Sequence, residues 1–332
     1  MIARIAIPFF LLMVLIVVPL VLALLFRYTL PRRMWRKTAL ACTILLWVLT
    51  GYGFLFGFQQ FEVHHIEYAS ADLPEAFDGY RIVQFSDAHV GSLTGRRQWM
   101  VQRAIDSINA QHADAIVFTG DMQNIYPDEL PSQSSYIRQL KAKDGAFAVL
   151  GNHDYAVYQD CDEAEKTANC QKTITALRNM GFNLLLNEHR VIYRDSDSIV
   201  IAGMENWGNV KRMPRNGDVK KTLAGIKTVN SQQLAANSHN PFIVMLQHDP
   251  SCWREKILPE CSAQLTLSGH THGGQVSLFG WSPVALRYHE WEGMTYEGSR
   301  AIYVSTGLGA LIPFRIGLPG EIVVIKLKRI ED

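Results

Sequence analysis

Two long uncharged apolar runs constrain the fold of this chain more than any other feature of its sequence. They extend over residues 5–26 and 38–58, which are 22 and 21 residues long. A helix of that length spans about 30 Å, the thickness of the hydrocarbon core of a membrane. A buried core helix or a signal peptide is the alternative, but a signal peptide has a shorter apolar region followed by a cleavage site. The sequence therefore predicts two transmembrane helices within residues 1–60 and a second domain over residues 61–332.

The positive charges around these runs predict how the helices are oriented. Five Lys or Arg residues lie in the linker between the two runs, whereas residues 59–80 contain none. Because short loops rich in Lys and Arg stay in the cytoplasm, we expect the linker on that side and both termini outside. The second domain would then lie on the periplasmic or extracellular side of the membrane.

The cysteines offer an independent indication of the compartment. One falls inside the second apolar run, and the other four form two pairs whose partners are nine residues apart: Cys161, Cys170, Cys252 and Cys261. We expect a disulfide within each pair, which would agree with an exported domain because disulfides form in oxidising compartments. Four cysteines allow three connectivities, and reduced thiols in a cytosolic domain are the alternative.

The remainder of the chain has an ordinary globular composition, because the apolar excess lies in the first 58 residues. About 270 residues are enough for one large α/β domain or for two small ones. The formal net charge is +1, which implies no bulk attraction to nucleic acid. A nucleic-acid partner is therefore not expected.

Short apolar runs that end in polar or glycine-rich loops predict buried strands in the second domain. These runs are residues 81–85, 115–119, 147–150, 198–202, 242–247, 264–267, 301–304 and 321–327. Residues 98–111 space apolar side chains at helical intervals, and residues 130–141 and 171–180 do so more weakly. Strands that alternate with helices predict a layered α/β fold.

Polar residues follow five of these runs, at the point where each expected strand ends. The segments are Ser86-Asp87-Ala88-His89, Thr119-Gly120-Asp121, Gly151-Asn152-His153-Asp154, Gln247-His248-Asp249 and Gly269-His270-Thr271-His272. Any one of them alone is explained as well by a turn or a buried histidine. Ligand sites in α/β sheets lie at the carboxyl ends of the strands, so five such segments together predict one polar site. The glycines ahead of Asp121, Asn152 and His270 would let the backbone approach a bound ion.

The segments SDAHVG, FTGDM, LGNHDY, LQHDP and SGHTHGGQ resemble the motifs of the calcineurin-like metallophosphoesterase superfamily, over about residues 79–327. The resemblance implies two mixed β-sheets packed as a sandwich flanked by helices, and a centre of two divalent metal ions. It implies that Asp87, His89 and His272 bind the first ion, that Asn152, His248 and His270 bind the second, and that Asp121 bridges them. This nitrogen and oxygen donor set suits manganese, iron or zinc.

The resemblance also implies the chemistry, which is hydrolysis of a phosphoester by a phosphodiesterase or a phosphatase. Two such ions offset the phosphate charge and lower the pKa of a bridging water, so that hydroxide attacks phosphorus. His153 follows a ligand and is expected to protonate the leaving oxygen. Arg315 is a candidate for binding the phosphate, with a surface ion pair as its alternative role. Asp154 either orients His153 or caps a helix.

The predicted anchor bears on the substrate and on the location. The matches resemble the membrane-tethered or exported bacterial branch of the superfamily, which implies the bacterial inner membrane. A site held near the bilayer favours a lipid-linked phosphate as substrate, with a released phosphoester such as a nucleotide as the alternative. Aromatic residues within 279–296 either face acyl chains or pack in the core. The competing function is a non-catalytic, metal-stabilised binding or scaffold protein, for which the proton donor His153 would have no purpose.

Overall fold

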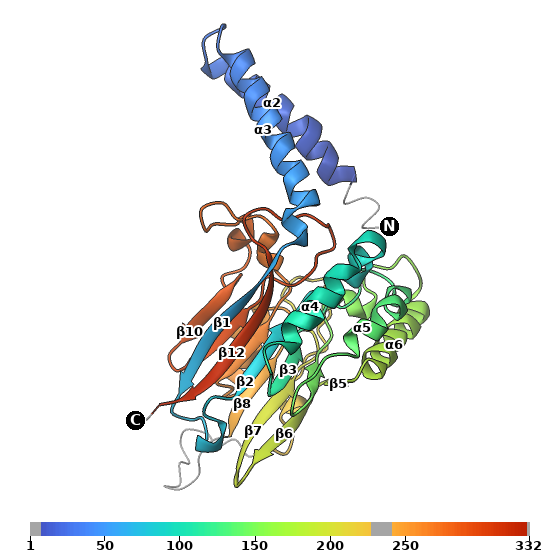
Figure 1. Cartoon of the computed structure of the whole chain (residues 1–332), viewed down its shortest axis with the longest axis vertical. Helices are drawn as coiled ribbons and strands as arrows, with labels where there is room; N and C mark the ends of the chain where they lie inside the picture. Colours follow the sequence, from blue (N-terminus) through green and yellow to red (C-terminus); the bar gives the residue numbers. More distant parts are fainter. Residues whose placement is uncertain (1–7, 227–240, 331–332) are drawn as a thin grey trace.

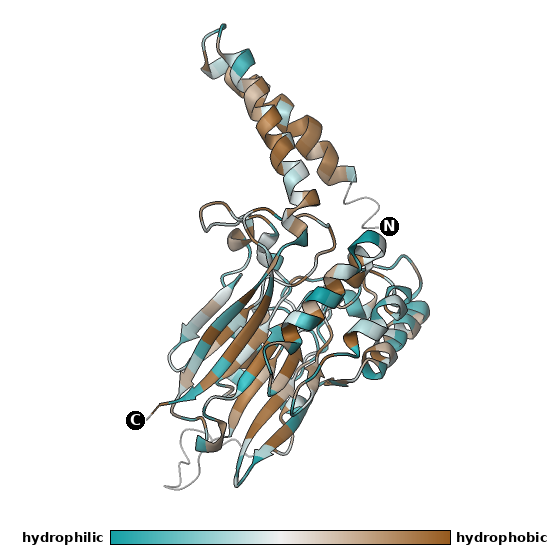
Figure 2. Cartoon of the chain, in the orientation of Figure 1, coloured by the Kyte–Doolittle hydropathy of each residue, from teal (hydrophilic) through white to brown (hydrophobic). Residues whose placement is uncertain are grey.

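The computed structural model describes residues 8–226 and 241–330, and it consists of a helical hairpin and an α/β domain (Figure 1). In the hairpin, a π-helical turn, Met13–Val17, leads into α2, Val18–Thr29, and α3 follows at Trp35–Leu55. By length and composition, Pro8–Thr29 and Trp35–Gln59 are candidate membrane spans. Both helices are predominantly apolar (Figure 2). The first predicted helix is thus present from Pro8, and its residues 5–7 lie outside the described residues.

The first sheet of the domain has six strands in the order β1-β12-β2-β3-β4-β5. β12 is antiparallel to β2, and the other neighbours are parallel. The strands are β1 Phe61–Ser70, β2 Arg81–Phe85, β3 Ala115–Phe118, β4 Ala146–Ala148, β5 Phe182–Leu184 and β12 Gly320–Arg329.

The second sheet also has six strands, in the order β10-β11-β9-β8-β7-β6. Its inner pairings are parallel and its two outer pairings are antiparallel. The strands are β6 Glu188–Arg194, β7 Asp197–Gly203, β8 Phe242–Leu246, β9 Leu265–Ser268, β10 Gly293–Glu297 and β11 Arg300–Val304.

The main core lies between the two sheets, and helices cover their outer faces (Figure 1). Buried side chains such as Val117, Phe147, Val244 and Leu267 fill the space between the sheets. The helices on the first sheet are α4 Trp99–Asn109, α5 Ser134–Ile137 and α6 Glu163–Asn179. Those on the second sheet are α7 Val219–Thr222 and α8 Leu258–Glu260. A π-helical turn, Trp253–Ile257, leads into α8. The predicted sandwich of two mixed sheets flanked by helices is therefore confirmed.

The eight predicted strands are all present, but the sequence did not indicate β1, β5, β6 and β10. β1 and β6 are rich in charged residues and His and are largely solvent-accessible, and β5 has only three residues, so none reads as a buried apolar run. Among the helices, the predicted segment 171–180 extends back to Glu163 in α6. The predicted segment 130–141 reduces to a 3-10 turn, Pro131–Gln133, followed by the short α5.

The predicted disulfides are wrong, because all five cysteines are free. Cys170 lies inside α6 and Cys161 lies just before its N-cap, Asp162. Nine residues of mostly helical chain separate two Cα atoms by about 13–14 Å, whereas a disulfide needs them about 4.4–6.8 Å apart. Cys252 and Cys261 flank one continuous helical segment and are held apart in the same way. The thiols therefore give no support to an oxidising compartment.

The end of α3 packs directly on the α/β domain. The backbone N–H of Arg315 donates to the carbonyl of Gly53 at 3.2 Å. The ring of Phe314 lies 5.0 Å, centroid to centroid, from both Phe10 and Phe54 in the hairpin. Phe58, which follows α3, is fully buried in a cluster with side chains of α4. The hairpin is thus docked on the domain rather than joined to it by a free linker.

Candidate metal centre

The five polar segments meet at one end of the sandwich, beyond the carboxyl ends of strands from both sheets. They follow β2, β3 and β4 of the first sheet and β8 and β9 of the second. β1 starts directly after the hairpin, and β12 runs parallel to it. Because β2 runs antiparallel to β12, the carboxyl end of β2 lies at the end of the domain that faces α3 (Figure 1). The topology therefore brings together side chains that are nearly two hundred positions apart, and it does so on the hairpin side.

The backbone of these segments is held in an uncommon conformation. Asp87, His89, Asp121, His270 and His272 all have left-handed φ angles, between 41° and 74°. Such angles are infrequent for residues other than glycine, and strained positions of this kind gather at functional sites. The neighbouring glycines are also required, since a Cβ on Gly151 would collide with the Asp121 carboxylate and one on Gly269 with that of Asp87.

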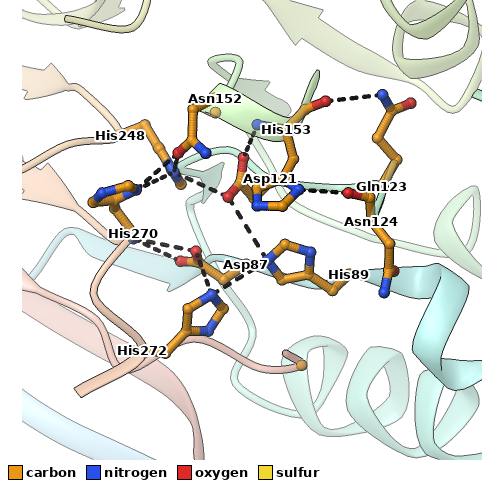
Figure 3. A network of polar contacts seen from close by, with 12 residues as sticks. Asp87, His89, Asp121, Gln123, Asn124, Asn152, His153, His248, His270 and His272 are labelled. Carbon is orange, nitrogen blue, oxygen red and sulfur yellow. Dashed lines mark hydrogen bonds and ion pairs between the residues drawn. The ribbon is translucent and has the colours of Figure 1, made fainter. Parts of the chain in front are cut away.

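One half of the site consists of Asp87, His89 and His272, whose ligand atoms lie within 4.8 Å of one another. The Nε2 atoms of the two imidazoles are 3.2 Å apart, and Nε2 of His272 is 3.5 Å from Oδ1 of Asp87 (Figure 3). Asp87 is also fixed from behind, because the backbone N–H of His270 donates to its carboxylate. The three side chains therefore point at a common position.

The other half consists of Asn152, His248 and His270. Oδ1 of Asn152 lies 3.1 Å from Nε2 of His248 and 2.8 Å from Nδ1 of His270, and the two ring nitrogens are 3.2 Å apart (Figure 3). The imidazole of His248 is oriented by its other nitrogen, Nδ1, which lies 2.7 Å from the carbonyl oxygen of Thr119. A backbone carbonyl that fixes the far nitrogen is a frequent support for a metal-binding histidine.

Asp121 lies between the two halves. Its Oδ2 is 3.2 Å from Nε2 of His248 and 3.7 Å from Nε2 of His89, while Oδ1 accepts the backbone N–H of His153 at 2.8 Å. One carboxylate oxygen thus faces an imidazole of each half, which is the position that the predicted bridging role requires.

The donor set fits divalent metal ions. Burial lowers the pKa of His89 well below its usual range and that of His272 to about 4, so both rings are neutral near pH 7. Among the residues that the structure describes, their Nδ1 atoms are buried without a hydrogen-bond partner, and their Nε2 lone pairs converge with the carboxylates. Buried carboxylates need a compensating positive charge. Neutral nitrogens and anionic oxygens facing one point form the environment that a cation of the manganese, iron or zinc type prefers.

His153 lies beside this cluster, as the sequence predicted. A ring nitrogen is within 4.8 Å of the ligand atoms of His89 and Asp121. Its Nδ1 is in close contact with the carbonyl oxygen of Asn124 (Figure 3), so Nδ1 must carry the hydrogen of that contact. Nε2 is left as the nitrogen that can exchange a proton, and the rings of His89 and Tyr158 pack against the imidazole.

Asp154 has a role that sequence reasoning missed. Its buried carboxylate accepts backbone N–H groups from Asp121 at 2.9 Å, Met122 at 3.0 Å, Gln123 at 3.3 Å and Gly151 at 3.0 Å. The contact with the Gly151 N–H caps the 3-10 turn Asn152–Tyr155, in line with the expected capping role, and the other three contacts reach the loop after β3. Asp154 thus ties the loop after β3 to the loop after β4, and thereby positions Asp121 next to Asn152.

Two tyrosines also support the ligands without having been predicted as site residues. The hydroxyl of Tyr288 lies 2.9 Å from Nε2 of His270, and the hydroxyl of Tyr158 accepts a hydrogen bond from Nδ2 of Asn152 at 2.9 Å. Tyr288 was noted only as part of an aromatic-rich stretch. No motif marks either residue, because each reaches the site through the fold.

Arg315 lies close to the site, but its guanidinium is hydrogen-bonded to backbone carbonyls. Its guanidinium is buried and donates to the carbonyls of Thr306, Gly307 and Gly309 at 2.8–2.9 Å, and to those of Leu318 and Pro319. Gly307 and Gly309 in turn pack against Asp87 and Ala88. These contacts favour a role in holding the loop behind Asp87 over the predicted role of binding the phosphate.

Comparisons with known proteins agree with this geometry. The sequence model of a protein family described as calcineurin-like phosphoesterase matches residues 80–274, more than half of the chain. The chain is similar to the metallophosphoesterase YkuE of Bacillus subtilis, with 32% identity over 84% of this chain and 90% of that protein. It is also similar to a transmembrane protein with metallophosphoesterase domain from Danio rerio, with 31% identity over 89% of this chain but only 63% of that protein. UDP-2,3-diacylglucosamine pyrophosphatase LpxG of Chlamydia trachomatis is 26% identical over 87% of this chain and 95% of its own length.

Proposed function

The chain belongs to the calcineurin-like phosphoesterase family, and on that premise we propose that it is a phosphoester hydrolase with a centre for two divalent metal ions. The observation that carries this proposal is the convergence of seven donor side chains on two adjacent positions, with the Asp121 carboxylate between them. Asp87, His89 and His272 would hold one ion, and Asn152, His248 and His270 the other. When bound, the ions supply charge neutralisation for the phosphate and lower the pKa of a water molecule.

The chain's own residues account for the remaining steps. Asp121, tied to His153 through the backbone N–H, fixes the spacing between the two halves of the site. His153 supplies a proton from Nε2 to the leaving oxygen, because its Nδ1 is occupied by the carbonyl of Asn124. Its imidazole packs T-shaped against His89, with ring centroids 4.8 Å apart, which supports a position from which it can reach a substrate bound at the metal centre.

We propose that the enzyme acts at a membrane surface on a phosphoester that carries acyl chains. The two candidate spans dock on the domain at the end where the metal centre lies. The name of the Chlamydia relative describes a pyrophosphatase of a diacylated nucleotide sugar, a phosphate compound of this amphiphilic class. The linker charges further favour a domain on the outer side of a bacterial inner membrane.

The function is tested with the full chain reconstituted in lipid nanodiscs and bis-p-nitrophenyl phosphate as a water-soluble probe. We expect hydrolysis to stop after treatment with EDTA and to return with Mn²⁺, Fe²⁺ or Zn²⁺. Asp121→Asn should abolish it, whereas Asp128→Asn, the same change at an exposed carboxylate seven positions away, should not. Bound metal without hydrolysis of this probe or of any phosphate headgroup in extracted membrane lipids would support the scaffold alternative instead.

A further inference from the structure

The segment Leu278–Leu286, called the apolar loop below, exposes large apolar side chains beside the metal-binding segment. Leu278, Phe279, Trp281 and Leu286 have exposed fractions of 56%, 108%, 52% and 83%. Reciprocal backbone hydrogen bonds between Leu278 and Trp281, at 2.9 and 3.1 Å, close a tight turn around Phe279 and Gly280. Both turn residues have positive φ, 55° and 78°. The turn therefore holds the Phe279 ring outward, and its exposure is a property of the backbone.

The apolar loop starts from the part of the domain that contacts α3. The N–H of Ser277 donates to the carbonyl of Ile316 at 2.9 Å, and the N–H of Ile316 donates to the carbonyl of Gln275 at 2.9 Å. The preceding residue, Arg315, donates its N–H to Gly53 in α3. The loop is therefore one backbone pairing away from the hairpin, and the orange-brown chain after β9 lies beside the domain end of α3 in Figure 1.

The exposure of α3 itself indicates how far the bilayer extends toward the domain. Leu55 and Phe56, at the end of α3, are about 60% exposed. Exposure of such large apolar side chains to water is unfavourable, so in a spanning hairpin they face lipid. Gly53, the residue that Arg315 contacts, precedes both of them. The domain therefore already reaches the helix at the depth of the lipid-facing residues, and the apolar loop extends from that level.

We propose that the apolar loop is a second membrane contact, which inserts Phe279, Trp281 and Leu286 into the interface of the leaflet where α3 ends. Lipid is the occupant because the loop continues the apolar surface of the hairpin, and because Trp and other amphipathic aromatic residues favour the membrane–water interface. This inference rests on the proposed membrane location and deepens the proposed function.

The loop also connects this surface to the metal centre. Tyr288, two residues beyond Leu286, reaches Nε2 of His270 with its hydroxyl, and Ser282 packs on Gly274 of the metal-binding segment. Insertion of the loop would hold the metal centre at the level of the lipid phosphates. The substrate class that fits this placement is an amphiphilic phosphoester presented from the bilayer, rather than one arriving from bulk water.

The proposal is tested by measuring membrane depth with a bimane label in the full chain, reconstituted into vesicles that contain brominated phospholipid. The label is placed by Phe279→Cys, with Leu45→Cys in the middle of α3 as the membrane control. Tyr193→Cys serves as the water control, since Tyr193 is an aromatic residue, 73% exposed, on β6, which lies far from α3. The wild-type chain, labelled in parallel, provides the background from the native cysteines.

We expect the brominated lipid to quench the label at position 279 and at position 45, and to leave it unquenched at position 193. Quenching at position 45 but not at 279 would overturn the membrane contact of the loop while leaving the span intact. A lack of quenching at all three positions would overturn the span as well, and the loop contact with it. Hydrolysis of bis-p-nitrophenyl phosphate by the same samples tests the proposed activity separately, because that probe does not require the bilayer.

Discussion

Replacing Asp154 with alanine should destabilise the metal-free domain by about 4 kcal/mol. The carboxylate is fully buried and accepts four backbone N–H groups, from Gly151, Asp121, Met122 and Gln123. Each buried donor left without a partner costs about 1–3 kcal/mol. Four donors at the lower limit give about 4 kcal/mol, and losses above about 4–5 kcal/mol are exceptional for a single substitution. Asp154→Asn should lose less, since its amide retains one acceptor oxygen.

The assay is thermal unfolding of the full chain in detergent after removal of metal, followed by tryptophan fluorescence. For a domain of this size about 1 kcal/mol shifts Tm by about 2–4 °C, so we expect Asp154→Ala to unfold about 8–16 °C below the wild type. The matched control is Asp128→Ala, which removes an exposed carboxylate from the adjacent turn Pro127–Glu129 and should change stability by less than about 0.5 kcal/mol. An Asp154→Ala protein with the Tm of this control and reduced turnover would refute the reasoning, because Asp154 would then act through His153.

Three further predictions concern the proton donor, the metal affinity and the thiols. His153→Ala should keep its metal and its Tm but lose about 10²–10⁴-fold in turnover of bis-p-nitrophenyl phosphate; an unchanged rate would remove its role. Burial alone would lower the pKa of His248, but the Asp121 carboxylate outweighs burial and raises it, so the ring stays protonated through neutral pH and must release its proton when an ion binds. Metal affinity should therefore increase from pH 6 to pH 8, with proton release in titration calorimetry, and a pH-independent affinity would contradict this. Denatured, unreduced protein should titrate all five cysteines as free thiols, and a shortfall would indicate a disulfide.

The sequence was sufficient to predict the sheets' central strands and the polar segments that follow them, for one physical reason, whereas the individual ligand roles are what the family resemblance implies. A strand buried on both faces is a continuous apolar run. The residues that follow it lie at the carboxyl end of the sheet, where ligand sites form. β2 and β8 illustrate this, since each is buried along almost its whole length and leads directly into Asp87 or His248. Edge strands such as β1 and β6 lack that signal, because one or both faces meet solvent.

The features that the sequence did not reveal depend on how the backbone is folded, either locally or between loops. Cysteine spacing indicated two disulfides, but the intervening chain is helical and keeps each pair apart. Asp154 was expected to act on its neighbour His153 or on a local helix end, whereas most of its hydrogen bonds come from a loop about thirty positions away. Arg315 looked available for a phosphate, yet backbone carbonyls occupy its guanidinium. In each case the deciding feature is a backbone arrangement, either a helix or a loop, that no sequence motif marks.

If seven side chains build one centre for two ions, counting the bound metal should show it. After removal of metal and reloading with Mn²⁺ or Zn²⁺, elemental analysis should find about two ions per wild-type chain. Asp121→Asn should hold clearly fewer, because both halves of the site share that carboxylate. Asp128→Asn should match the wild type. A wild-type chain that binds no metal, or an Asp121→Asn chain that retains the full complement, would contradict the account.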